Sequence, residues 1–157
     1  MLPLGISTAA AGLYQEGFLA LPYPDAKGKA DDLDRTLLIW GGSSSVGSCA
    51  IQLAVASGAT VITTASPDNF EYCKKLGASK CFDYHDDDVE DHIVDALKGV
   101  TGLGAFHAVG ADGAVQTCGK ILARTNGKAI LVTVRGVPDG IPGEVRAKAS
   151  KCSFAVA

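Results

Sequence analysis

Residues 36–47 read Thr-Leu-Leu-Ile-Trp-Gly-Gly-Ser-Ser-Ser-Val-Gly, an apolar run followed by a loop of small side chains. An apolar-rich segment follows at 48–57, and after Gly58 and Ala59 a second apolar run occupies 60–64. Buried parallel strands are apolar throughout rather than alternating, and both runs have this character. The stretch therefore predicts strand, turn, helix and strand, a βαβ unit of about 30 residues.

The loop of this unit has the composition of a phosphate-binding site. Its short side chains would let a phosphate reach the N–H groups at the helix N-terminus, where the partial charge is positive, and serine hydroxyls could add donors. Gly47 would let the helix pack close to the strand. The spacing from Gly42 to Gly47 is looser than G-x-G-x-x-G and lacks the Gly-Lys-Ser/Thr ending of a P-loop. The loop therefore favours a dinucleotide over triphosphate hydrolysis.

Composition indicates one globular domain. The chain has 157 residues, of which 47% are hydrophobic and 20% charged, with 19 glycines, as in a turn-rich α/β protein. The net charge of −3, without a cluster of basic residues, argues against nucleic acid and anionic membranes as partners. No apolar run has membrane-spanning length. The five cysteines include no C-x-x-C pair, so we expect reduced thiols in a cytoplasmic protein, without disulfides or zinc.

Strands and helices alternate along the rest of the chain. Ser66 and Pro67 mark a helix start, with Ser66 as N-cap, and Gly77 marks its end. The aspartates at 86–88 are expected to complement a helix dipole rather than to hold a metal. His107 is expected to be a hydrogen-bonded core residue. The further predicted helices are 4–19, 89–98 and 113–123, and the further strands are 80–84, 104–110, 128–134 and 150–157.

This alternation predicts an α/β fold, a doubly wound parallel sheet of Rossmann type in three layers, α/β/α, with the ligand at the carboxyl ends of the strands. Domains that prefer NAD generally place a carboxylate after the second strand, to hold the ribose. Here that position reads Thr64-Ala65-Ser66, whose hydroxyls would donate to a 2′-phosphate, so NADP(H) is the expected cofactor. Asp68 lies close by, and we explain it as a residue of the helix start.

A series of motifs resembles the cofactor domain of medium-chain dehydrogenase/reductases. The similarity is greatest to the zinc-free, quinone-reductase-like and fungal trans-acting enoyl-reductase-like branch, and it covers nearly the whole chain. The motifs stand in the same order at 41–47, 50–54, 61–67, 75–78 and 82–84.

The resemblance implies which residues contact the cofactor. Those expected at the pyrophosphate are Ser43, Ser44, Ser45 and Val46. Those expected at the 2′-phosphate and adenine are Ser66, Asn69 and Tyr84; many quinone-reductase-like proteins have lysine at the position of Asn69. Those expected to flank the nicotinamide are Val109, Gly110, Thr133 and Val134, followed by Arg135. No catalytic side chain is assigned.

The resemblance also implies a function. Reductases of this type carry an N-terminal GroES-like domain that supplies most of the substrate pocket, and no such domain is expected in residues 1–157, which we interpret as a single dinucleotide-binding domain. The parent protein would transfer hydride from NADPH to an activated C=C or a carbonyl, of enoyl or quinone type. The isolated chain would bind cofactor with little catalysis. Edge strands of this domain often pair in related proteins, so 150–157 is a candidate homodimer edge.

Two alternatives remain open at this point. A non-catalytic nucleotide-sensing module would bind the same cofactor without transferring hydride. A methyltransferase could bind S-adenosylmethionine on a similar sheet, but it would need an acidic residue after the second strand to hold the ribose, and this chain has none there.

Overall fold

The computed structural model describes residues 2–24, 30–110, 113–125 and 127–150, without the side chains of residues 2 and 3. The described residues form a six-stranded sheet in the order β3-β2-β1-β4-β5-β6. Every pairing in it is parallel, which confirms the predicted fold class. The strands are β1 Arg35–Trp40, β2 Thr60–Ala65, β3 Lys80–Asp83, β4 Thr101–His107, β5 Ile130–Thr133 and β6 Arg146–Ala149.

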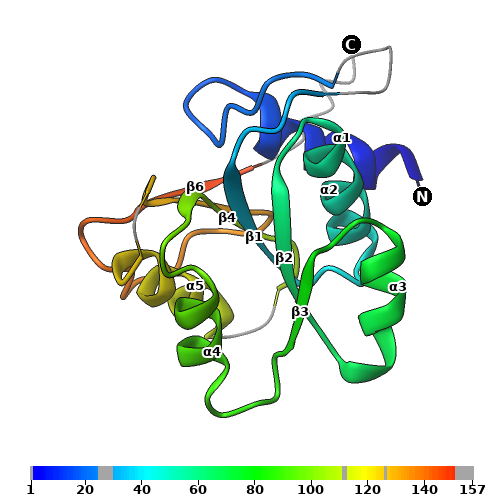
Figure 1. Cartoon of the computed structure of the whole chain (residues 1–157). Coiled ribbons are helices and arrows are strands. Elements are labelled where there is room, and N and C mark those ends of the chain that lie inside the picture. Colours follow the sequence, from blue (N-terminus) through cyan, green and yellow to red (C-terminus); the bar gives the residue numbers. More distant parts are fainter. Residues whose placement is uncertain (1, 25–29, 111–112, 126, 151–157) are drawn as a thin grey trace.

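Helices cover both faces of the sheet, giving three layers (Figure 1). One face is covered by α1 Leu2–Tyr14, α2 Ser45–Ala56 and α3 Phe70–Lys75, the last preceded by the 3₁₀ turn η1 Pro67–Asn69. The other face is covered by α4 Val89–Ala96 and α5 Ala114–Ala123. None of the described helices is both long and apolar enough to cross a bilayer.

The two apolar faces of the sheet explain why β1 and β2 contain almost only apolar side chains and threonine. In β1, Ile39 belongs to the cluster beneath α1–α3, whereas its neighbour Leu38 belongs to the cluster beneath α4 and α5. Both side chains are buried because both faces are covered. The strand order reverses between β1 and β4, which is where doubly wound sheets open a crevice for ligands.

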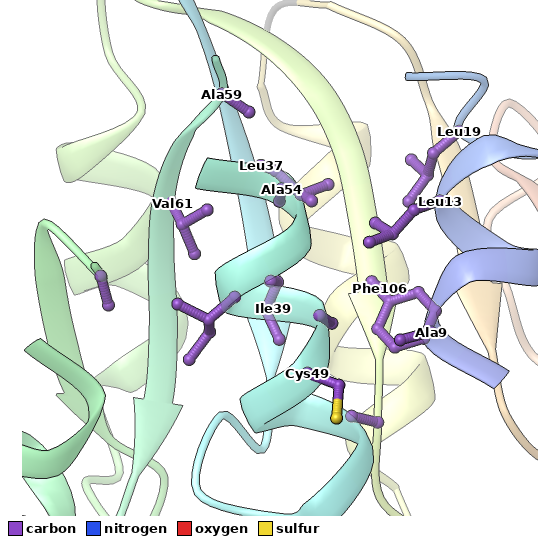
Figure 2. Packing of buried hydrophobic residues seen from close by; sticks show 14 of the residues in the cluster. Ala9, Leu13, Leu19, Leu37, Ile39, Cys49, Ala54, Ala59, Val61 and Phe106 are labelled. Atoms are coloured by element: carbon purple, nitrogen blue, oxygen red, sulfur yellow. The ribbon is translucent and has the colours of Figure 1, made fainter. Parts of the chain in front are cut away.

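Helix α1 packs directly on β4. Figure 2 shows the Phe106 ring of β4 beside Ala9 of α1, with Leu13 near it. A side chain at Gly12 would overlap this ring, so the helix approaches the strand more closely than any larger residue would permit. The helix ends at Tyr14 rather than at the predicted residue 19, because the chain turns back at Gly17, whose φ is +82°.

The predicted final strand at 150–157 lies outside the described residues, apart from Ser150. The sixth strand of the described sheet is Arg146–Ala149, which the sequence did not predict. Its sequence, Arg-Ala-Lys-Ala, belongs to an edge strand with charged side chains, which a search for apolar runs cannot detect. Strand β4 also begins at Thr101, before the predicted residue 104, with a register shift against β1 between Thr36 and Leu37.

Replacing Gly12 by alanine should destabilise the fold, although alanine is the better helix former. The added methyl group would overlap Phe106 and lie 2.9 Å from Val132 Cγ1. Overpacking costs about 1–3 kcal/mol, more than the roughly 1 kcal/mol gained in helix propensity. Urea unfolding should therefore report a net loss of about 1 kcal/mol. The control Gly143→Ala has no atom within 4 Å of the new Cβ, and equal stability of the two variants would contradict this packing.

Candidate dinucleotide-binding site

The loop between β1 and α2 is shaped by three glycines that have no room for a side chain. A Cβ at Gly47 would overlap the carbonyl oxygen of Gly41, and one at Gly42 would overlap Thr63 Oγ1. Gly41 itself has φ +84°, and a Cβ there would lie 2.5 Å from Val109 Cγ1. The start of α2 is therefore held against the turn after β1, as expected for Gly47.

The hydroxyl of Ser44 builds the loop rather than facing a ligand. It is the N-cap of α2: its Oγ accepts the Gly47 N–H at 3.0 Å and donates to the Gly41 carbonyl at 2.8 Å. The hydroxyl proton of Ser44 is used inside the loop, and the expected contact of Ser44 with a pyrophosphate stays a prediction. Ser43 and Val46 are half-buried and Ser45 is exposed.

The loop leaves backbone donors for an anion. The N–H groups of Ser45 and Val46, in the first turn of α2, donate to no acceptor in the described part of the chain, since the first hydrogen bond closing that turn comes from Ser48 N to Ser44 O at 2.8 Å. Unpaired N–H groups at a helix start carry the positive end of its dipole. Together with the missing side chains at Gly42 and Gly47, they fit a pyrophosphate.

Two polar contacts that the sequence did not indicate support this loop. Thr64, on β2, accepts the Gly41 N–H through its Oγ1 at 3.0 Å. Tyr72, on α3, donates its hydroxyl to Ser48 Oγ at 3.1 Å, and Ser48 in turn donates to the Ser44 carbonyl at 2.8 Å. Thr64 could have been suspected from the two threonines that end an otherwise apolar strand. Tyr72 carries no sequence signal, because its contact depends on how α3 lies against α2.

The residues expected at the 2′-phosphate meet at the carboxyl ends of β2 and β3. The Asn69 side-chain amide donates to Ser66 Oγ at 2.8 Å. The register pairs Asp83 with Ala65, so Tyr84 follows β3 where Ser66 follows β2. Tyr84 is 45% exposed and its ring lies 4.1 Å from that of His85. Ser66 takes the N-cap position but makes no capping hydrogen bond, because its hydroxyl is engaged by Asn69 rather than by the η1 backbone.

The carboxylates near this end of the sheet do not take the ribose-binding position directly after β2. Asp68 is exposed on η1. Asp83 accepts the backbone N–H of His85 and contacts its Nδ1, both at 3.0 Å, and the backbone hydrogen bond lowers the pKa of the Asp83 carboxyl. The end of β2 itself carries Ala65 and Ser66, as the sequence indicates.

The residues expected at the nicotinamide follow β4 and β5. Val109 is half-buried over Gly41, and Gly110 is exposed. Thr133 is wholly buried; its Oγ1 accepts the N–H of Arg135 at 3.2 Å. Val134 is half-buried and its N–H donates to the His107 carbonyl at 3.1 Å. The side chain of Thr133 therefore positions the chain that leaves β5 rather than lining a surface.

His107 is a core residue, but the expectation that its ring is hydrogen-bonded is wrong. The side chain is wholly buried, and neither ring nitrogen has a partner among the described residues. The register places it between Trp40 and Thr133, and neither side chain bonds to the ring. Burial disfavours the charged imidazolium and lowers the pKa of His107 to about 4.

A parallel sheet whose order reverses beside a glycine loop at a helix start defines a dinucleotide-binding α/β domain. Comparison with known proteins is consistent with this class, because the profile of a family described as zinc-binding dehydrogenases matches residues 45–150. The chain belongs to this family, and thus to the medium-chain dehydrogenase/reductases.

Individual relatives are consistent with this family. The dehydrogenase pigH of Monascus ruber is 48% identical over 131 residues, covering 83% of this chain and 35% of that protein. The trans-enoyl reductase himH of Aspergillus japonicus is 40% identical over 147 residues, covering 94% and 41%. The quinone oxidoreductase of Coxiella burnetii superposes with a TM-score of 0.62 at 29% identity, covering 97% and 43%. The chain thus spans about two-fifths of the length of these proteins.

Zinc is named in the description of the family, but the described residues do not offer it a site. Within the described ranges, no three His, Cys, Asp or Glu side chains converge as metal ligands. Cys118 is wholly buried, and burial raises the pKa of its thiol. Asp86, in the acidic turn before α4, is paired with His92 at 3.0 Å.

His107 should make the fold sensitive to mild acid. Below pH 6.5 the unfolded chain binds a proton at this histidine, whereas the native state does not until the pH approaches 4, so stability falls as the pH decreases through this window. Between pH 7.5 and pH 5.0 the contribution of this one group is about 2 kcal/mol.

Urea unfolding at pH 7.5 and at pH 5.0 measures this loss of stability. The variant His107→Leu should lose about 2 kcal/mol less than the native sequence over the interval. The control His92→Gln, which alters an exposed histidine of α4, should behave like the native sequence. An unchanged pH dependence in His107→Leu would contradict the assignment.

Proposed function

We propose that the chain binds NADP(H) and forms the cofactor-binding part of a reductase that transfers hydride to an activated C=C or a carbonyl, of enoyl or quinone type. The proposal rests on the N–H groups of Ser45 and Val46, which have no acceptor among the residues that the structure describes, in a loop whose glycines leave no room for side chains. An anionic pyrophosphate is the ligand that such a loop suits.

The preference for NADP(H) over NAD(H) rests on the end of β2. A carboxylate there would repel a 2′-phosphate, whereas the hydroxyl of Ser66 and the amide of Asn69, 2.8 Å apart, supply donors to it. Tyr84 follows the neighbouring strand with an exposed ring that adenine could stack on. A protein with the same fold, the quinone oxidoreductase of Escherichia coli, was solved in complex with NADPH, at a TM-score of 0.65 and 21% identity.

The reductase activity is proposed for the whole protein, from the names of its relatives. These include dehydrogenases and trans-enoyl reductases that are more than twice as long as the part matched here. When bound, the nicotinamide supplies the hydride, and the residues of this chain bind and orient it. Most of the substrate pocket would come from outside this domain, so we expect the chain alone to bind cofactor and catalyse little.

The free edge of the sheet is a candidate for self-association. Among the described strands, β6 pairs only with β5, which leaves its other edge without a partner strand. An unpaired edge can accept a second copy of itself, so we retain a homodimer through this end of the chain as part of the proposal.

Calorimetric titration of the chain with NADPH and with NADH tests the cofactor assignment. NADPH should bind more tightly. Replacing Ser66 by aspartate should weaken NADPH binding about tenfold or more, because a donor to the 2′-phosphate is replaced by a like charge, while NADH binding is retained or improved. The control Thr60→Asp adds the same charge to the opposite end of β2, where Thr60 is exposed, and should leave both affinities unchanged.

Other results would redirect the assignment. Tighter binding of NADH than of NADPH would indicate that Asp68 holds the ribose, and it would reject the phosphate site at Ser66 and Asn69. Binding of S-adenosylmethionine in place of either nucleotide would favour a methyltransferase. NADPH binding by a full-length homologous reductase that transfers no hydride to any enone or quinone would favour the nucleotide sensor.

A further inference from the structure

The guanidinium of Arg135 lies against the backbone of Gly110. A Cβ at Gly110 would overlap Arg135 Nε, and both Cδ and Cζ of Arg135 would be 2.6 Å from it. Gly110 follows β4 and Arg135 follows β5, so the contact brings a cation onto the carboxyl ends of these two strands. Any side chain at Gly110 would have displaced it.

The backbone of Arg135 is held by hydrogen bonds. Its own N–H donates to the buried Thr133 Oγ1 at 3.2 Å, and the N–H of the preceding Val134 donates to the His107 carbonyl at 3.1 Å. Its side chain is exposed and has no hydrogen bond or ion pair with the described residues, since the hydrogen bond of Arg135 is made by its backbone. The backbone therefore fixes where the side chain starts, while its charge is not neutralised by a described carboxylate.

The position of Arg135 in the sheet determines which part of a bound dinucleotide would lie beside its guanidinium. The pyrophosphate site at the start of α2 lies at the point where the strand order reverses, with β2 and β3 on one side and β4 and β5 on the other. Ser66 and Asn69, the proposed donors to the 2′-phosphate, follow β2, so the adenosine half of the cofactor would lie on the β2 side. The other half, which ends in the nicotinamide, then extends over Val109 and Gly110 toward Arg135.

Resting on the proposed function, we propose that Arg135 makes the site selective for the oxidation state of the cofactor, so that the reduced form, NADPH, binds more tightly than NADP⁺. The nicotinamide ring is neutral in NADPH and carries a positive charge in NADP⁺. A guanidinium beside the ring repels only the oxidised form. The site would bind NADPH, the hydride donor, and release NADP⁺ after hydride transfer, as a reductase requires.

The size of the effect follows from Coulomb's law. Two like charges about 4 Å apart in a well-hydrated site repel enough to lower affinity about fivefold, and more where the site is drier. The effect should weaken as salt is added, because an exposed charge is screened. A contact of Arg135 with the pyrophosphate instead would strengthen binding of both oxidation states equally, so the ratio of the two affinities separates these roles.

The test is to measure Kd for NADPH and for NADP⁺ by calorimetry, in the native sequence and in Arg135→Gln. The native chain should bind NADP⁺ about fivefold more weakly than NADPH, and in Arg135→Gln this ratio should fall by about the same factor. Arg135→Lys keeps the charge and should keep most of the ratio. Arg146→Gln makes the same replacement at an exposed arginine that begins β6, at the amino ends of the strands and away from the carboxyl ends where Arg135 lies, and should leave the ratio unchanged.

Each outcome decides the proposal. If Arg135→Gln still binds both nucleotides and the ratio of the two Kd values does not change, the proposed role of Arg135 is overturned while the proposed function stands. An equal loss of affinity for both forms has the same meaning. Failure of the native chain to bind either nucleotide would instead reject the proposed function, together with this inference. Because Arg135 is exposed and its side chain makes no described hydrogen bond, the glutamine variant is expected to fold normally.

Discussion

This architecture depends on the close approach of Gly47, in the first turn of α2, to the carbonyl oxygen of Gly41, directly after β1. With no side chain in between, the helix begins almost on top of the strand it follows. That proximity turns the first N–H groups of α2 toward the carboxyl edge of the sheet, where the strand order reverses. A steric constraint between two glycines thereby creates the electrostatic character of the site.

Polar groups inside the sheet keep this arrangement in register. Thr63 and Thr64 are wholly buried at the end of β2, yet both are hydrogen-bonded: Thr63 donates to the Ile39 carbonyl at 2.6 Å, and Thr64 accepts the Gly41 N–H. Buried hydroxyls are tolerated when they are paired in this way. The last residues of β2 therefore fix both the end of β1 and the loop that follows it. Two adjacent threonines thus join the proposed ribose side and the proposed pyrophosphate side of the candidate site.

The parts of the fold that the sequence predicts are those specified locally. The βαβ unit from β1 to β2, the glycine loop and the helix end at Gly77 follow from apolar runs and turn residues a few positions apart, and all are present as expected. Strand β6 was not predicted because a short, charged edge strand has no such pattern. The contacts of Tyr72 with Ser48 and of Arg135 with Gly110 depend on how separate elements lie against each other, and local patterns carry no information on that.

Helix α1 has a consequence for how the chain folds. The helix packs on Phe106 of β4 and against α2, and the carbonyl of Thr8 accepts the Ser150 hydroxyl at 3.4 Å across a sequence separation of 142 residues. Part of the surface that α1 packs against therefore lies far later in the sequence. Closing such a long loop costs chain entropy before any contact rewards it, and topologies of this kind fold slowly. During synthesis, the face of α1 that packs on Phe106 stays uncovered until β4 has been made.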